Sequence, residues 1–235
     1  MRVERVDRSG VGDLINRLTA QDSDAALTAA TDDALHLLGT LTAEQDLQEL
    51  LTGGLAAQVA GLYDPKSDRL YLVDGGGVTA TDSTLLHEIV HAVQDARYDL
   101  EGNAFRPRPG DADAQTAAQS VAEGDATEVQ ERYLQQAGAG AILEELGGAV
   151  GQLSQAPACQ RQLPTFLQRS LEFPYTSGAT FIRQVRAAGG EAAVRAAREE
   201  FNAAIGRRDA DAIARLLAPG YHIVTGRSDQ SHGAR

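Results

Sequence analysis

Two histidines four residues apart constrain this chain more than any other feature of its sequence. Residues 87–91 read HEIVH, which is the pattern HExxH. Positions i and i+4 lie on one face of an α-helix, so both imidazoles can reach a single metal ion from a helix. Glu88 stands one residue further round that helix, where its carboxylate can approach a water on the ion without ligating the ion. The pattern therefore predicts a helix that carries a metal site.

The limits of this helix are also written in the sequence. Residues 81–83, Thr-Asp-Ser, form a good N-cap cluster, and the helical pattern continues to about Tyr98. Apolar residues surround the two histidines, which predicts that the helix is buried. A buried helix with two imidazoles and a carboxylate is costly unless these groups are paired or bind a metal. The apolar neighbours are Leu85, Leu86, Ile89, Val90 and Val93.

A catalytic zinc site needs a third protein ligand in addition to the two histidines. The three-histidine pattern HExxHxxGxxH is excluded, because Gln94 and Arg97 stand where glycine and histidine are required. A carboxylate is then the most economical third ligand, and Glu123, on a second helix expected over residues 111–136, is the best candidate. Small residues around it would let the two helices approach closely. The rival carboxylates are Asp95, Glu101, Asp113, Asp125 and Glu128.

The rest of the chain predicts an α+β fold that is mainly helical, with a small sheet or hairpin beside the HExxH helix. Leucines recur at helical spacing from about residue 12 to 51, and Gly53–Gly54 interrupts the pattern. Residues 59–63 and 69–73 are β-prone and flank a run of turn residues, which is typical of a β-hairpin. Two shorter helices are expected further on, over residues 166–173 and 178–188.

Composition excludes several function classes. The chain has 235 residues, a formal net charge of -12 and a pI near 4.8, and the basic patch of a nucleic-acid binder is missing. Cys159 is the single cysteine, so cysteines cannot supply a zinc site or an intrachain disulfide. The opening residues carry charges without a following apolar run, and no stretch is apolar enough for a membrane span. These features predict a cytoplasmic protein, or a secreted one if the recorded start omits an export signal.

Five short elements, in this order along the chain, carry a resemblance to a known family. They are AGLYDP at residues 60–65, LYLV at 70–73, HEIVHAVQD at 87–95, EGDA at 123–126 and PYTSG at 174–178. Together they resemble a group of bacterial HExxH zinc metallopeptidases similar to the gluzincins, in which a glutamate on a following helix is the third ligand. The resemblance covers about residues 40 to 190.

This resemblance implies a zincin-like metallopeptidase domain over residues 1–190 that hydrolyses peptide bonds in a peptide or protein substrate. His87, His91 and Glu123 would hold Zn²⁺, Glu88 would act as the general base, and Tyr175 would donate a hydrogen bond to the oxyanion. The chain departs from the thermolysin pattern, which has an aspartate four residues after the glutamate. Thr127 occupies that position, so Asp95 and Asp125 are alternative partners for a ligand histidine. We also expect the strand at residues 69–73 to bind an extended peptide by edge pairing.

The end of the chain has a different resemblance. Residues 201–224 resemble the opening of a SnoaL-like or NTF2-like domain, which predicts a helical tail over residues 191–235 that is too short to build the pocket of such a domain. Two alternatives to a peptidase therefore remain. One is an inactive relative that binds a metal or a peptide, and the other is a scaffold or small-molecule-binding role centred on the tail.

Overall fold

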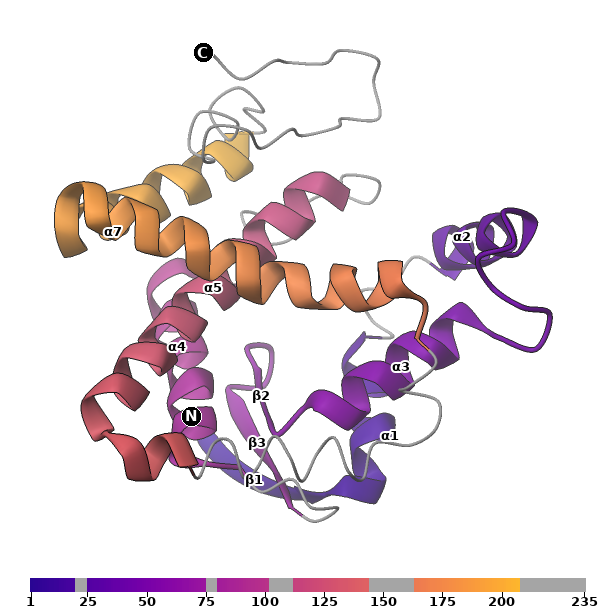
Figure 1. Ribbon diagram of the computed structural model, residues 1–235, viewed down its shortest axis with the longest axis horizontal. Coiled ribbons are helices and arrows are strands. Elements are labelled where there is room, and N and C mark those ends of the chain that lie inside the picture. Colours follow the sequence, from indigo (N-terminus) through magenta and orange to yellow (C-terminus); the bar gives the residue numbers. More distant parts are fainter. Residues whose placement is uncertain (20–24, 75–79, 102–111, 144–162, 208–235) are drawn as a thin grey trace. The chain divides into compact units, whose positions relative to one another are not determined.

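A computed structural model describes residues 1–19, 25–74, 80–101, 112–143 and 163–207 (Figure 1). The fold is α+β and mainly helical with a small sheet, as the sequence predicts. The chain divides into two compact units, and helices α4, α5 and α7 have residues in both. The first unit comprises Met1–Ile89 and Tyr133–Leu171, and the second comprises Val90–Arg132 and Glu172–Arg235.

The first unit contains a three-stranded sheet in the order β1-β3-β2. Strands β2 (Gly61–Asp64) and β3 (Arg69–Asp74) form the predicted antiparallel hairpin, with Gly61 opposite Leu72. Strand β1 (Arg2–Asp7), which the sequence did not predict, pairs with β3 in parallel. Its side chains are mostly exposed, so it lacks the alternation by which a strand is found.

The position of β3 corrects one expectation. Because β1 and β2 pair with its two sides, residues 69–73 form the central strand of the sheet rather than an edge. The proposed edge pairing of a peptide with this strand is therefore wrong, since its backbone N–H and C=O groups are used within the sheet.

The helical region expected over about residues 12–51 is divided among three helices. They are α1 (Val11–Thr19), α2 (Ala25–Leu37) and α3 (Leu47–Gln58). The Asp46 side chain caps α3 by accepting a hydrogen bond from the backbone N–H of Glu49.

Gly53 and Gly54 were expected to interrupt the helical pattern, but both lie inside α3. A Cβ on Gly54 would lie 3.0 Å from a methyl group of Leu163, so a close tertiary contact accounts for this glycine. Two groups of buried side chains form the core of the first unit. One contains Leu41, Leu47, Leu163 and Leu167, and the other contains Val11, Ile15 and Val73.

Helices α5 (Ala112–Ala137) and α7 (Thr165–Arg207) cross within the second unit at two glycines. A Cβ on Gly124 would lie 2.1 Å from the carbonyl carbon of Gly178, and a Cβ on Gly178 would lie 1.9 Å from the Ser120 carbonyl oxygen. Real Cβ atoms do not come that close to other atoms, so the two backbones touch. The small residues of α5 were expected to face the HExxH helix, but Gly124 faces α7.

Helix α7 corrects a second expectation. Residues 166–173 and 178–188 belong to one helix, which continues through Pro174. Ala179 and Ile182, 1% and 0% exposed, fix the following turns in the core, and this packing outweighs the preference of proline for a helix end. The helix bends at Gly189 and Gly190, where Gly190 has a φ of 66° (Figure 1).

Some expectations fall outside the described residues. These are the expectations for Cys159 and for the tail beyond residue 207. Within the described part of the chain, no helix has the combined length and apolarity that a membrane crossing requires.

Candidate metal centre

The HExxH helix, α4 (Asp82–Tyr98), has the limits that the sequence predicts. The Thr81 hydroxyl accepts a hydrogen bond from the backbone N–H of Thr84 at 3.2 Å and so caps the first turn. At the other end, a carboxylate oxygen of Asp95 accepts a hydrogen bond from the Leu100 backbone N–H at 3.0 Å. Asp95 therefore stabilises the end of the helix.

The buried side of α4 is polar, contrary to expectation. Ser83, His87, Glu88 and Gln94 are between 2% and 9% exposed, whereas Val93 is 60% exposed. The other apolar neighbours of the motif are only partly buried. Because buried polar groups need partners, this helix is held by specific hydrogen bonds more than by apolar packing.

The two histidines of the motif meet Glu123 of α5. His87, His91 and Glu123 each offer one ligand atom, and these three atoms lie within 4.8 Å of one another. Nε2 of His91 and Oε2 of Glu123 lie 3.2 Å apart. With bonds of about 2.0–2.1 Å, two ligand atoms of a tetrahedral zinc site are separated by about 3.3 Å. The spacing of this pair therefore suits one small divalent cation.

Gln94, one turn after His91, is a residue that the sequence analysis missed. Its Oε1 lies 2.9 Å from Nδ1 of His91, and its Nε2 donates to the Ala122 carbonyl at 3.1 Å and to Oδ2 of Asp125 at 2.9 Å. Gln94 thus contacts His91, which we expected Asp95 or Asp125 to orient, and it links His91 to Asp125. The sequence signal was a polar residue three positions after a ligand, on the same side of the helix.

Glu88 belongs to the first unit, where it meets the hairpin. The backbone N–H of Tyr63 donates to Oε2 of Glu88 at 2.8 Å, which places strand β2 beside the HExxH helix as predicted. A Cβ on Gly61 would lie 2.8 Å from Cγ of Glu88. Gly61 therefore provides the space in which the Glu88 side chain lies.

Two of the rival carboxylates are neutralised by arginines of α7. Asp125, 2% exposed, is paired with Arg198, and Glu128, 4% exposed, is paired with Arg186. Among the residues that the structure describes, His87, His91 and Glu123 form the one group of three or more potential ligands with this spacing. Glu123 is thus distinguished from these two rivals by its surroundings.

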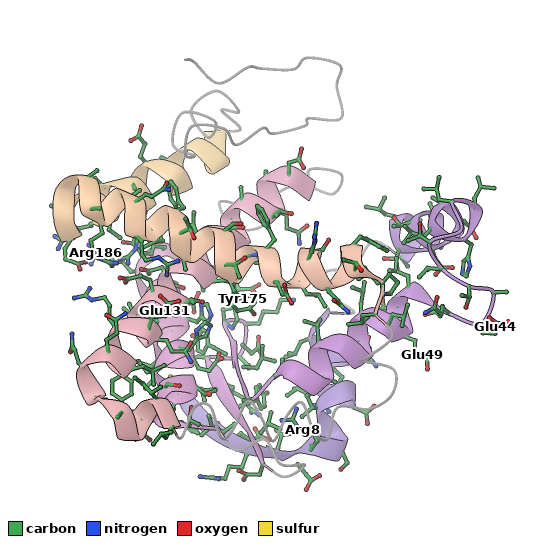
Figure 2. All side chains as sticks on the ribbon, viewed as in Figure 1. Arg8, Glu44, Glu49, Glu131, Tyr175 and Arg186 are labelled. Atoms are coloured by element: carbon green, nitrogen blue, oxygen red, sulfur yellow. The ribbon has the colours of Figure 1, made fainter. Side chains whose placement is uncertain are left out.

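Tyr175 lies on α7 and is 40% exposed (Figure 2). It precedes Gly178 by three residues, so it stands slightly less than one helical turn, roughly 4.5 Å along the axis, from the crossing with α5. Its role as a hydrogen-bond donor to an oxyanion stays a prediction. The glycine of the same PYTSG element has a clear structural role, because it allows the close approach of α5.

Comparisons with known proteins give no relative for this chain. No protein-family model matches it, and no curated protein or solved structure matches it either. The geometry of the three ligands is therefore the basis on which a function has to be argued.

Proposed function

We propose that this chain is a zinc-dependent peptidase with a zincin-like domain, and that His87, His91 and Glu123 hold its metal. One observation carries the proposal: a carboxylate from α5 meets the two imidazoles of an HExxH helix at the spacing of metal ligands. An HExxH sequence can occur by chance on any helix. A third ligand from a separate helix at this spacing is much harder to obtain by chance.

The donor set favours zinc among divalent cations. Two imidazoles and one carboxylate suit a borderline-soft ion, and three protein ligands leave a fourth position for water or substrate. When bound, zinc supplies Lewis acidity, which lowers the pKa of a water towards about 7 and polarises a carbonyl group. The side chains of His91 and Glu123 are 13% and 16% exposed, so solvent retains partial access to both ligands.

Glu88 is suited to act as the general base of the reaction. Glu88 is 7% exposed, and the hydrogen bond from the Tyr63 backbone N–H holds one of its carboxylate oxygens. A base held in this way loses little entropy when it takes a proton from the attacking water. It then gives the proton to the leaving amine as the peptide bond breaks. In the proposal Tyr175 donates a hydrogen bond to the oxyanion that forms at the scissile carbonyl.

Metal analysis combined with hydrolysis of a labelled, unfolded protein such as casein tests the proposal. We expect about one zinc per chain in the wild type, and its loss in His91→Ala and in Glu123→Ala. Glu200→Ala is a matched control, since Glu200 is an exposed glutamate of the second unit. Glu88→Gln should keep the zinc and lose hydrolysis, typically by 10²-fold or more.

Two results would contradict this function. A folded wild type that takes up no zinc would show that the three residues do not form a metal site. If the wild type holds zinc but shows no peptide hydrolysis that Glu88→Gln abolishes, the chain binds a metal and is not a peptidase.

A further inference from the structure

The orientation of the Gln94 amide is fixed by its neighbours. One end of the amide faces two acceptors, the Ala122 carbonyl and the Asp125 carboxylate, at 3.1 and 2.9 Å. Only the NH₂ group can occupy that end, because an oxygen there would face two other oxygens. The amide oxygen, Oε1, must therefore face His91, and an oxygen can only accept.

The orientation of this amide fixes the proton on His91. Since Oε1 of Gln94 accepts, Nδ1 of His91 must carry the proton that it donates over 2.9 Å. Nε2 is then the nitrogen that can offer its lone pair to a metal, and it is the one that faces Oε2 of Glu123 at 3.2 Å. A cation between these two acceptor atoms removes the repulsion between them.

Asp125 and Arg198 hold the amide in turn. Asp125 is 2% exposed and carries a negative charge that would be costly in isolation. Its Oδ2 accepts a hydrogen bond from the Gln94 NH₂ group, and its Oδ1 is paired with the Arg198 guanidinium. Arg198 lies after the bend at Gly189–Gly190, so the part of α7 beyond residue 190 contributes to the surroundings of the metal ligand.

We infer that Gln94, Asp125 and Arg198 form a chain of positioning residues that holds His91 with Nδ1 protonated and Nε2 turned to the metal. The inference rests on the proposed function only in taking His91 as a metal ligand. It adds that residues 191–207 belong functionally with the metal centre, instead of forming an independent tail. Partners of a ligand histidine typically change metal affinity by about 10- to 100-fold when they are removed.

The test uses the full chain with zinc alone and measures two quantities, neither of which requires substrate. The first is the zinc dissociation constant, obtained by competition with a chromophoric chelator. The second is the ring-nitrogen pattern of His91 by long-range ¹H–¹⁵N NMR, which shows which nitrogen is metallated and whether the Nδ1 proton is protected from exchange. That protection can also be followed in the metal-free protein.

We expect Gln94→Met to raise the zinc dissociation constant by about 10- to 100-fold and to remove the protection of the Nδ1 proton. Gln119→Met, at an exposed position of α5, is the matched control and should change neither quantity. Arg198→Leu should act in the same direction as Gln94→Met, and Arg195→Leu, at an exposed position of α7, should not. If Arg198→Leu fails to fold, Arg198→Lys replaces it, because lysine keeps the charge and loses the guanidinium geometry.

The inference is overturned if His91 binds zinc through Nδ1, or if Gln94→Met keeps wild-type affinity and proton protection. These outcomes are separate from those of the proposed function. A protein that holds zinc with the expected ring pattern and cleaves nothing contradicts the peptidase alone. A wild type that binds no zinc contradicts the proposed peptidase. Protection of the His91 Nδ1 proton in the metal-free protein, and its loss in Gln94→Met, would still test the inference.

Discussion

Replacing Gly178 by alanine tests the contact between α5 and α7. The new Cβ would lie 1.9 Å from the Ser120 carbonyl oxygen, and real Cβ contacts are no closer than 3.0 Å. The nearest atoms, in Ser120 and Gly124, belong to the backbone of α5. No side chain can therefore turn away, and the two helices must move apart. A gap of about 1 Å forfeits a quarter to a half of the dispersion energy of each atom pair at the crossing.

The cost should reach the upper end of the range for overpacked sites, about 3 kcal/mol. Alanine also favours a helix over glycine by about 1 kcal/mol, so the net loss should be about 2 kcal/mol. Gly53→Ala measures that helix preference by itself, because Gly53 lies inside α3 and a Cβ there meets nothing within 4 Å. This control should stabilise the protein by about 0.5–1 kcal/mol.

The assay is urea unfolding followed by circular dichroism, on both variants and the wild type. Because Glu123 precedes the Gly124 contact by one residue, Gly178→Ala should also weaken zinc binding, whereas Gly53→Ala should leave it unchanged. If the two variants have the same stability, α5 and α7 do not touch at these glycines, and the reasoning from the crossing is wrong.

Three further predictions concern other sites. Gly61→Ala should lower the rate of peptide hydrolysis and leave the zinc content unchanged, because its Cβ would lie 2.8 Å from Cγ of Glu88. Ile182→Ala should lower the free energy of unfolding by about 2–5 kcal/mol, since Ile182 is fully buried. The hydrogen bond from Arg186 lowers the pKa of Glu191 below its usual 4.5. The ionised Glu191 therefore stabilises the fold above pH 4.5, and this stabilisation is lost as the pH falls through the lowered pKa. Because the Arg186–Glu191 pair is exposed, the stabilisation is at most about 1 kcal/mol. Glu191→Gln should remove it, so acid unfolding curves of variant and wild type should converge at low pH.

The sequence predicted best where local rules decide the structure. The start of α4 follows from a threonine cap, and the hairpin at 61–74 follows from its turn residues, so both were predicted correctly. Glu123 came from a different kind of reasoning: zinc chemistry requires a third ligand, spacing left several carboxylates open, and the family resemblance implied Glu123 among them. The structure places Glu123 beside the two histidines.

The sequence predicted less well where partners distant in the chain decide the structure. Strand β1 forms because β3 pairs with it, while its own residues stay mostly exposed. Pro174 stays inside a helix because the residues after it are buried. Gln94 looked like a mere departure from a known pattern, and its role depends on Asp125, 31 residues further along the chain.

Arg198, which lies beyond the bend at Gly189–Gly190, has a consequence for the order in which the proposed metal centre would be assembled during synthesis. The two histidines are available as soon as α4 forms, but Arg198 lies 73 residues after the carboxylate with which it pairs. Closing so long a segment carries an entropic cost that is met only when α7 docks on α5. A partly synthesised chain that ends before α7 already contains His87, His91 and Glu123. We expect it to bind zinc less tightly until Arg198 has been made and α7 has docked. In the proposed peptidase, such a sequence of events would keep the centre inactive until the rest of its own domain has folded.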